Sequence, residues 1–411
     1  MQKIIKEDKN QILFPTVIPS VIEGVDITLP PDIERLSQVF KLDTLKDIQH
    51  EIQTPGQPNK NKVGHKISEL TFKTRQDLRK KGVLQVTGRK LYVVGGIVRD
   101  WLINHFHGLA NPHVDWDLAT DASVESLKLI IRAGIEKGIL HPDTHLYESG
   151  KKFGNVHLVI SGNTYEITTF PFSGYPNAPR MYLDSLRRNF NVNALYYSIE
   201  DQKIYDYHAG IADVYRKSPS FIGKLKNKLK EEENGLYPLV YARMYAKMNN
   251  KDHFDNEIEK ELKKFIIPKN ISKKEIYEEF QKGIKQSIDK RKYINVLYNS
   301  GLLEQIFPGI KLNHNPEIGD MTMFPLIVAQ ILKPNWNNLG HLSETLHFLE
   351  FPSQEIHDIM FLIKLPHYIN ENDLKKDRLH TGLSERAIEQ FVKTNNFARK
   401  DWIMKMVRNG Y

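Results

Sequence analysis

The chain has 411 residues, 40% of them apolar, with a net charge of +8 and no cysteine. The absence of cysteine excludes disulfides, zinc thiolates and thiol nucleophiles, and no stretch approaches the ~18 apolar residues that a membrane span needs. The basic surplus is compatible with a polyanionic partner such as nucleic acid, although many basic proteins bind nothing anionic.

Residues 1–75 are expected to form an N-terminal extension of unknown role. The start, MQKIIKEDKNQILFP, is charged and lacks the apolar run of a signal peptide, so we expect a cytoplasmic protein without membrane contact. The stretches FPTVIPSVIEG and TLPPD break regular structure. Residues 53–64 are rich in Pro, Gly and Asn and predict a linker or long loop.

Residues 76–216 predict a mixed head of strands and helices. An apolar run, KLYVV, ends at Gly95 and Gly96, and residues 97–106 then repeat apolar side chains at helical spacing. VDWDLAT (114–120) follows as an extended segment, and Ser123 is a good N-cap for the helical pattern 123–138. Residues 155–170 predict a hairpin, because two β-rich runs flank a Ser-Gly-Asn turn.

Residues 217–411 predict a helical region, which places the whole chain in the α+β class. Amphipathic patterns cover residues 273–287 and 386–396. Lysines 224, 226, 228 and 230 form a basic stretch that suits RNA, although a solvated helix face explains most such lysines.

Two aspartates, Asp115 and Asp117, lie two residues apart in the extended segment. In a strand both would point to one face, with their Cα atoms ~7 Å apart and Trp116 on the other face. Carboxylates at that spacing repel unless they share a cation, and Mg²⁺ prefers oxygen ligands. For a lone Asp-x-Asp, a solvated loop is the simpler explanation. Glu166 shares a strand face with Thr168, where it could complete a metal cluster or face solvent.

The glycines and arginines suggest a phosphate site. The Gly95–Gly96 turn leads into a helix N-terminus, which favours anions, and Arg99 adds a fork of donors. Arg187 and Arg188 stand in DSLRRNFNVNALYY, where buried arginines need an anionic partner. A common glycine turn and a surface arginine pair are the plain alternatives.

Together these motifs resemble the class II tRNA nucleotidyltransferase (CCA-adding enzyme) and bacterial poly(A) polymerase family. The resemblance covers about residues 90–250 and consists of GGIVRD (95–100), DWDLATDA (115–122), EITTF (166–170), RRNFNVNAL (187–195) and YDYHAGIADV (205–214). Several motifs in the family's order are far more specific than any one of them. The resemblance implies a polymerase-β-like nucleotidyltransferase head followed by a helical neck and body that grip RNA.

The resemblance also implies two-metal phosphoryl transfer from an NTP to an RNA 3′ end. ATP is the first expectation for the nucleotide and CTP the second, and tRNA is the first candidate acceptor. Asp115 and Asp117 would hold two Mg²⁺ ions, with Glu166 as a supporting third acid. The implied nucleotide-binding residues are Gly95, Gly96, Arg99, Asp184, Arg187, Arg188, Asn193 and Arg243, with Asp184 placed to bind ribose.

The chain departs from the family pattern at several positions. Asn189 stands where the family has Asp, Pro171 replaces the Arg of Thr-Thr-Phe-Arg, and the loop 171–183 is short. The family's base-selecting Glu-Asp-x-x-Arg aligns with residues 233–237, where Asn234 and Tyr237 replace Asp and Arg. These differences favour a working nucleotidyltransferase with altered nucleotide or acceptor choice.

Two alternatives remain open at this stage. The same chemistry could modify a protein or small molecule, as in a toxin or effector, because function belongs to the site and not to the fold. A non-catalytic RNA-binding paralogue could also keep the scaffold, although retained acids without a metal would be unfavourable.

Overall fold

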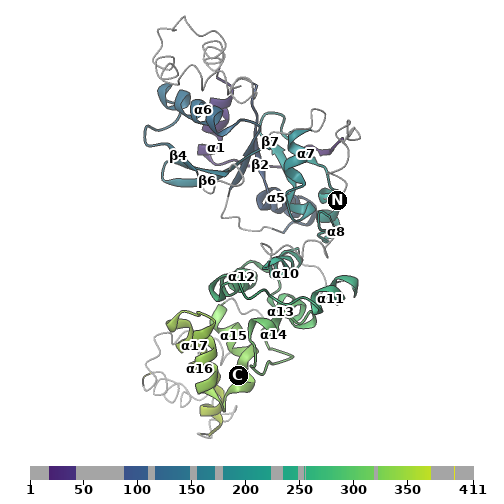
Figure 1. Cartoon of the computed structure of the whole chain (residues 1–411), viewed down its shortest axis with the longest axis vertical. Helices are drawn as coiled ribbons and strands as arrows, with labels where there is room; N and C mark the ends of the chain where they lie inside the picture. Colours follow the sequence, from purple (N-terminus) through teal and green to yellow (C-terminus); the bar gives the residue numbers. More distant parts are fainter. Residues whose placement is uncertain are drawn as a thin grey trace, which may run out of the picture. The chain divides into compact units, whose positions relative to one another are not determined.

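The computed structural model describes residues 18–42, 88–109, 116–148, 155–171, 179–223, 235–248, 254, 256–318, 323–371 and 393, the side chains only as far as residue 364 in the helix that ends at residue 371. These residues form two compact units that divide between Ile222 and Gly223 (Figure 1). The first unit contains a mixed sheet with helices, and the described part of the second is helical. The predicted α+β class is therefore confirmed.

In the described part of the first unit, eight strands build one sheet in the order β1-β8-β7-β2-β3-β6-β5-β4. The strands are β1 (Ser20–Ile22), β2 (Leu91–Val94), β3 (Asp117–Thr120), β4 (His145–Glu148), β5 (Asn155–Ile160), β6 (Asn163–Thr169), β7 (Leu195–Ser198) and β8 (Lys203–Asp206). Only the β3–β6 pair is parallel, and every other neighbouring pair is antiparallel. The connection between β3 and β6 includes a helix, as parallel pairing requires.

The helices of the first unit include the two that the sequence predicts, over residues 97–106 and 123–138. They are α1 (Pro31–Phe40), α5 (Gly96–His107), α6 (Val124–Glu136), α7 (Arg180–Ser185), the 3-10 turn η1 (Asn191–Asn193) and α8 (Gly210–Arg216). Ser123 caps α6 by accepting a hydrogen bond from the backbone N–H of Ser126. Gly108 ends α5 with a left-handed backbone, φ +63°, which glycine adopts without strain.

The β5–β6 hairpin has the predicted turn and a clear alternation of burial. Ser161 and Gly162 both have positive φ, 51° and 81°, as a tight two-residue hairpin turn demands. Tyr165 and Ile167 are buried, whereas Glu166 and Thr168 lie on the more exposed face. The expected partition of this strand is confirmed, and it separates an apolar face from one available to ligands.

Two segments of the N-terminal region join the first unit. Strand β1 pairs with β8, and α1 packs against α6. Asp32 at the start of α1 is buried and accepts hydrogen bonds from Ser161, Asn163 and the Tyr165 hydroxyl. These bonds fasten α1 to the β5–β6 hairpin on the buried side of the sheet.

The second unit is described by α10 (Tyr237–Lys247), α11 (Asn256–Lys263), α12 (Lys273–Gln286), α13 (Lys290–Asn299), α14 (Leu302–Ile306), α15 (Phe324–Leu332), η3 (Lys333–Asn335), α16 (Leu339–Phe348) and α17 (Ser353–Glu371). A capping box between Ser272 and Glu275 starts α12. Phe280, Phe324 and Phe351 meet in its aromatic core. Within the described residues, no helix has both the length and the apolar character to cross a membrane.

Candidate active site

One row of side chains crosses the sheet and contains the predicted acids. Direct register partners run from Tyr147 through His157, Glu166, Asp117, Val94 and Tyr196 to Tyr205. Partners in register point to the same face of a sheet. The two acids, Asp117 and Glu166, therefore stand side by side at the centre of one face.

Asp117 begins β3, and Glu166 lies opposite it on β6. Both side chains are half-buried, and Asn155 donates a hydrogen bond to Glu166 Oε1 at 2.8 Å. The Oδ1 atom of Asn155 is buried and has no hydrogen-bond partner among the residues that the structure describes. Asp115 lies outside the described residues, so its expected place beside Asp117 stays a prediction.

The Gly95–Gly96 turn approaches Asp117 closely. Gly95 has φ +79° and ψ −139°, a conformation that other residues rarely adopt. A Cβ atom at position 95 would lie 2.9 Å from Asp117 Oδ2 and 3.7 Å from Arg188 Nη1. Only glycine therefore leaves room for the carboxylate, and the turn begins α5, whose first N–H groups favour an anion.

Arg188 is held beside this turn by a buried cluster. Its Nε and Nη2 atoms donate to Asp184 Oδ2 at 3.3 and 3.2 Å, and its guanidinium lies 5.2 Å from the centroid of the Tyr196 ring. Tyr196 in turn donates its hydroxyl hydrogen to Asp184 at 2.7 Å. Burial raises the pKa of Tyr196 well above its ordinary value. Burial opposes the charge of Arg188, but Tyr196 and Asp184 outweigh it and raise the Arg188 pKa.

The other predicted anion-binding residues have distinct surroundings. Arg99 is 3% exposed, pairs with Asp100 and donates to Asn193 Oδ1 at 2.6 Å. Arg187 is exposed to solvent, whereas the neighbouring Arg188 side chain is 19% exposed. The structure therefore brings Arg188 to the Gly95 turn, whereas Arg99 lies against Asn193.

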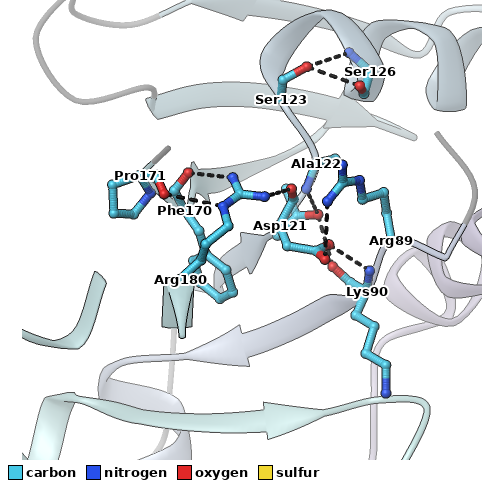
Figure 2. A network of polar contacts seen from close by, with 10 residues as sticks. Arg89, Lys90, Asp121, Ala122, Ser123, Ser126, Phe170, Pro171 and Arg180 are labelled. Carbon is cyan, nitrogen blue, oxygen red and sulfur yellow. Dashed lines mark hydrogen bonds and ion pairs between the residues drawn. The ribbon is translucent and has the colours of Figure 1, made fainter. Parts of the chain in front are cut away.

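Helix α7 is anchored by Arg180, a residue that belongs to none of the sequence motifs. Figure 2 shows its guanidinium donating to the carbonyls of Phe170, Pro171 and Asp121, at the ends of β6 and β3. Burial and the nearby Arg89 lower the pKa of Arg180 below its ordinary value, and Asp121 only partly offsets this shift. Because Asp184 and Arg188 follow four and eight residues later, this anchor fixes the position of the anion-binding cluster. The stretch before Arg180 (172–178) lies outside the described residues.

The DYHAGIADV motif (206–214) supports the site through contacts with the neighbouring Asn191. Gly210 lies so close to Asn191 that a Cβ atom there would meet its carbonyl oxygen at 2.4 Å. Asp213 accepts hydrogen bonds from Asn191 and Ser220, and Asp206 accepts from the backbone N–H groups of His208 and Ile211. These contacts lock this motif to RRNFNVNAL (187–195), the motif that carries both Arg188 and Asn193.

Arg243 belongs to the second unit, where it lies on α10. Its guanidinium donates to Glu279 and to Gln286, both on α12. Tyr237, aligned with the family's base-selecting Arg, is buried at the start of α10. Glu233 and Asn234, and the lysine stretch 224–230, lie outside the described residues.

The donor set suits a hard divalent cation. Two carboxylates in register on one face, with the orphaned amide oxygen of Asn155 beside them, offer oxygen ligands of the kind Mg²⁺ takes. Like charges directly opposite in a sheet cost stability, which a cation between them would offset. In the part of the chain that the structure describes, no group of three acidic, His or Cys side chains forms a metal cluster. Asp115, the other predicted ligand, lies outside the described residues.

The mixed sheet with an acid pair beside a glycine turn defines a nucleotidyltransferase head. Residues 91–218 match the Poly A polymerase head domain. The chain is 27% identical to the CCA-adding enzyme of Lactobacillus johnsonii, over 72% of this chain and 74% of that enzyme. It is 26% identical to Poly(A) polymerase I of Haemophilus influenzae, over 55% of this chain and only 50% of that enzyme.

A solved structure has the same fold. A tRNA nucleotidyltransferase complexed with a primer tRNA and an incoming ATP analog gives a TM-score of 0.51 at 18% identity, over 81% of this chain and 98% of that one. Residues 91–218 therefore carry the poly(A) polymerase head domain, and the chain is similar to members of the class II tRNA nucleotidyltransferase and bacterial poly(A) polymerase family, which are metal-dependent nucleotidyltransferases. The family prediction made from the motifs is confirmed.

Proposed function

We propose that the protein adds nucleotides from NTPs to the 3′ end of an RNA without a template. The observation that carries this proposal is the register of Asp117 with Glu166 on a half-open sheet face, next to Gly95 and Arg188. Carboxylates for metal ions beside a cation and a helix N-terminus are the parts that phosphoryl transfer needs. The relatives support the same activity, since they are named CCA-adding enzyme and poly(A) polymerase.

Asp115 and Asp117 are the proposed ligands of two Mg²⁺ ions, with Glu166 as the supporting acid. When bound, the metal ions neutralise phosphate charge and lower the pKa of the attacking hydroxyl. Arg188 and the N–H groups of the Gly95–Gly96 turn would hold the triphosphate. Arg99 and Asp184 would act mainly through the partners they hold, Asn193 and Arg188, and Arg187 and Arg243 stay weaker nucleotide-binding candidates.

Nucleotide and acceptor belong to the same proposal. ATP is the first candidate and CTP the second, and tRNA is the first acceptor, in keeping with the tRNA and ATP analog named for the similar structure. The replacement of the base-selecting Asp and Arg by Asn234 and Tyr237 leads us to expect altered base choice. The two alternatives, a protein or small-molecule acceptor and a non-catalytic role, have no support among the relatives. A chain without cysteine suits the reducing cytosol, which is the proposed location.

The test is extension of RNA by the purified full chain. Transfer RNA lacking its 3′ CCA, and mixed cellular RNA, would be incubated with Mg²⁺ and each labelled NTP in turn. We expect label on RNA with ATP or CTP, and none after EDTA is added. No incorporation with any NTP and any RNA, from a folded protein, would refute the proposal.

A further inference from the structure

The central row of side chains continues past the acids to the edge of the sheet. Beyond Glu166 the next register partners are His157 on β5 and Tyr147 on β4, the edge strand. With strands ~4.8 Å apart, the two rings lie about 10 and 14 Å across the sheet from Asp117. The nucleotide machinery does not use these two side chains.

The two rings form a stack on the exposed part of this face. The His157 and Tyr147 centroids are 5.1 Å apart with an interplanar angle of 22°, and Tyr147 also lies over His145 at 6.4 Å and 29°. Tyr147 is 46% exposed and His145 is exposed as well. A cross-strand pair of this kind can serve only to stabilise the sheet, but an exposed stack also offers a flat surface to a base.

A hollow connects His157, the inner ring of the stack, with the acids. A cavity of about 740 Å³ opens here, and its lining includes Asp117, Glu166, His157 and Thr164, all on the exposed face or at its edge. Pockets of that volume hold small molecules of nucleotide size and larger. Among the described residues, the surface from the acids to His157 is therefore continuous and unfilled by side chains.

The direction of the reaction decides what occupies this surface. In phosphoryl transfer the attacking and leaving oxygens lie roughly in line on opposite sides of phosphorus. Arg188 lies on the β2–β7 side of Asp117, over Tyr196, which suits the leaving pyrophosphate. The attacking 3′-hydroxyl must then approach from the β6–β5 side, where His157 and Tyr147 lie.

We propose that His157 and Tyr147 form a stacking platform for the bases at the 3′ end of the acceptor RNA. This inference rests on the proposed function and names the acceptor subsite of the same site. Stacking tolerates any base because every base has a π face. Such a platform would hold a growing end whose sequence changes with each addition.

The test compares two tyrosines in the full-length protein. Tyr147→Ala removes the outer ring of the platform and Tyr147→Phe keeps a ring there. Tyr215→Ala is the matched control, since Tyr215 is 64% exposed and stacks on His107 at 6.2 Å and 29°, away from the row. The readouts are KM for RNA, KM for NTP, and binding of an RNA ending in 2-aminopurine, whose fluorescence falls on stacking. Binding is measured without NTP, so this readout does not depend on transfer activity.

We expect Tyr147→Ala to weaken RNA binding and raise KM for RNA about tenfold, the size of one lost stacking contact. KM for NTP should stay constant, Tyr147→Phe should restore both RNA readouts, and Tyr215→Ala should match the wild type. RNA constants that do not change in Tyr147→Ala would show a purely structural pair. A change in KM for NTP alone would assign the rings to the incoming base. A wild type that neither binds nor extends RNA would refute the proposed function itself, and the platform with it.

Discussion

The two halves of one sheet face differ in how much of their chemistry is fixed inside the fold. On the half formed by β2 and β7, Met181 of α7 packs on an apolar cluster of Tyr92, Val94, Ala119, Phe170 and Tyr196. Arg188 is locked there by Asp184 and Tyr196. On the half formed by β6, β5 and β4, Glu166, His157 and Tyr147 remain half-buried or exposed. Asp117 and Glu166 lie where the two halves meet.

This difference fits the two ligands of the proposed reaction. A triphosphate is small and its charge does not depend on the base it carries, so a rigid cation in a low-dielectric cluster can hold it in one geometry. A growing RNA end changes its base at each step and must shift by one nucleotide. An open aromatic surface accommodates such a ligand, because stacking does not require one fixed sequence.

Removing the charge of Asp117, which lies where the two halves meet, should have the largest effect on kcat. Asp117→Asn keeps the shape of the side chain but removes the charge that a metal ion needs, and we expect kcat to fall on the order of 10³-fold. The matched control is Asp143→Asn, because that carboxylate is 90% exposed on the same unit and should be dispensable. Single-turnover transfer to RNA measures both. Equal rates for the two variants would place the chemistry elsewhere.

On the β2–β7 half of the face, substitutions of the two adjacent arginines should have different effects. Arg188→Met should lower kcat/KM for NTP about 10²-fold, since it removes a preorganised donor, and should cost about 3 kcal/mol by leaving buried Asp184 without a counter-charge. Arg188→Lys keeps a cation, so stability should largely return while KM for NTP stays raised. Arg187→Met should have a several-fold smaller effect on both. Urea unfolding and KM for each NTP separate the two contributions, and an Arg187 effect as large as that of Arg188 would reverse the assignment.

A substitution in the glycine turn can be compared with the same substitution at a second glycine of positive φ. Gly95→Ala places a methyl group 2.9 Å from Asp117 Oδ2 at φ +79°, and we expect a loss of about 2 kcal/mol in unfolding free energy together with a roughly tenfold lower kcat. Gly138 has φ +71°, but a methyl group there would have nothing within 4 Å. Gly138→Ala should therefore lose stability and keep its kcat. Denaturation and transfer assays on both variants check this, and an unchanged kcat in Gly95→Ala would contradict the close approach.

The sequence was sufficient for those parts of the site that depend on local pattern. Alternation in EITTF predicted the face of Glu166, and the glycines predicted the strand-to-helix turn at Gly95, because neither depends on distant residues. The register between strands was not predictable, since β6 pairs with β3 across α6 and the hairpin. The row that links Asp117 to His157 and Tyr147 therefore appears only in the fold.

The arginines show the same limit. Arg99 and Arg188 both stand in family motifs, and their chemistry in the sequence is identical. Their contacts in the fold differ. Arg99 donates to Asn193, whereas Arg188 reaches the Gly95 turn. Arg180 had no motif at all, yet its three carbonyl contacts set the position of α7. Pro171, where the family has Arg, supplies one of those carbonyls.

The smallest expected effect is a loss of stability at mildly acidic pH, through a histidine that contacts the end of α7. Burial lowers the pKa of His208 below its ordinary 6.5, with Asp206 opposing this, and the ring is hydrogen-bonded to Ser185 at the end of α7 at 2.8 Å. A histidine with a lowered folded pKa binds fewer protons when folded than when unfolded. Its contribution is therefore complete above pH 6.5 and declines as the pH falls from there through the folded pKa.

Between pH 7.5 and 5.5 the melting temperature of the wild type should thus fall more than that of His208→Gln, by no more than ~2 °C. Glutamine can still bond to Ser185 but does not titrate, so the difference isolates the ring. Thermal melts of both proteins across this range measure it. Parallel curves would mean that the ring is protonated equally in the folded and unfolded chain, and that α7 does not depend on its neutral form.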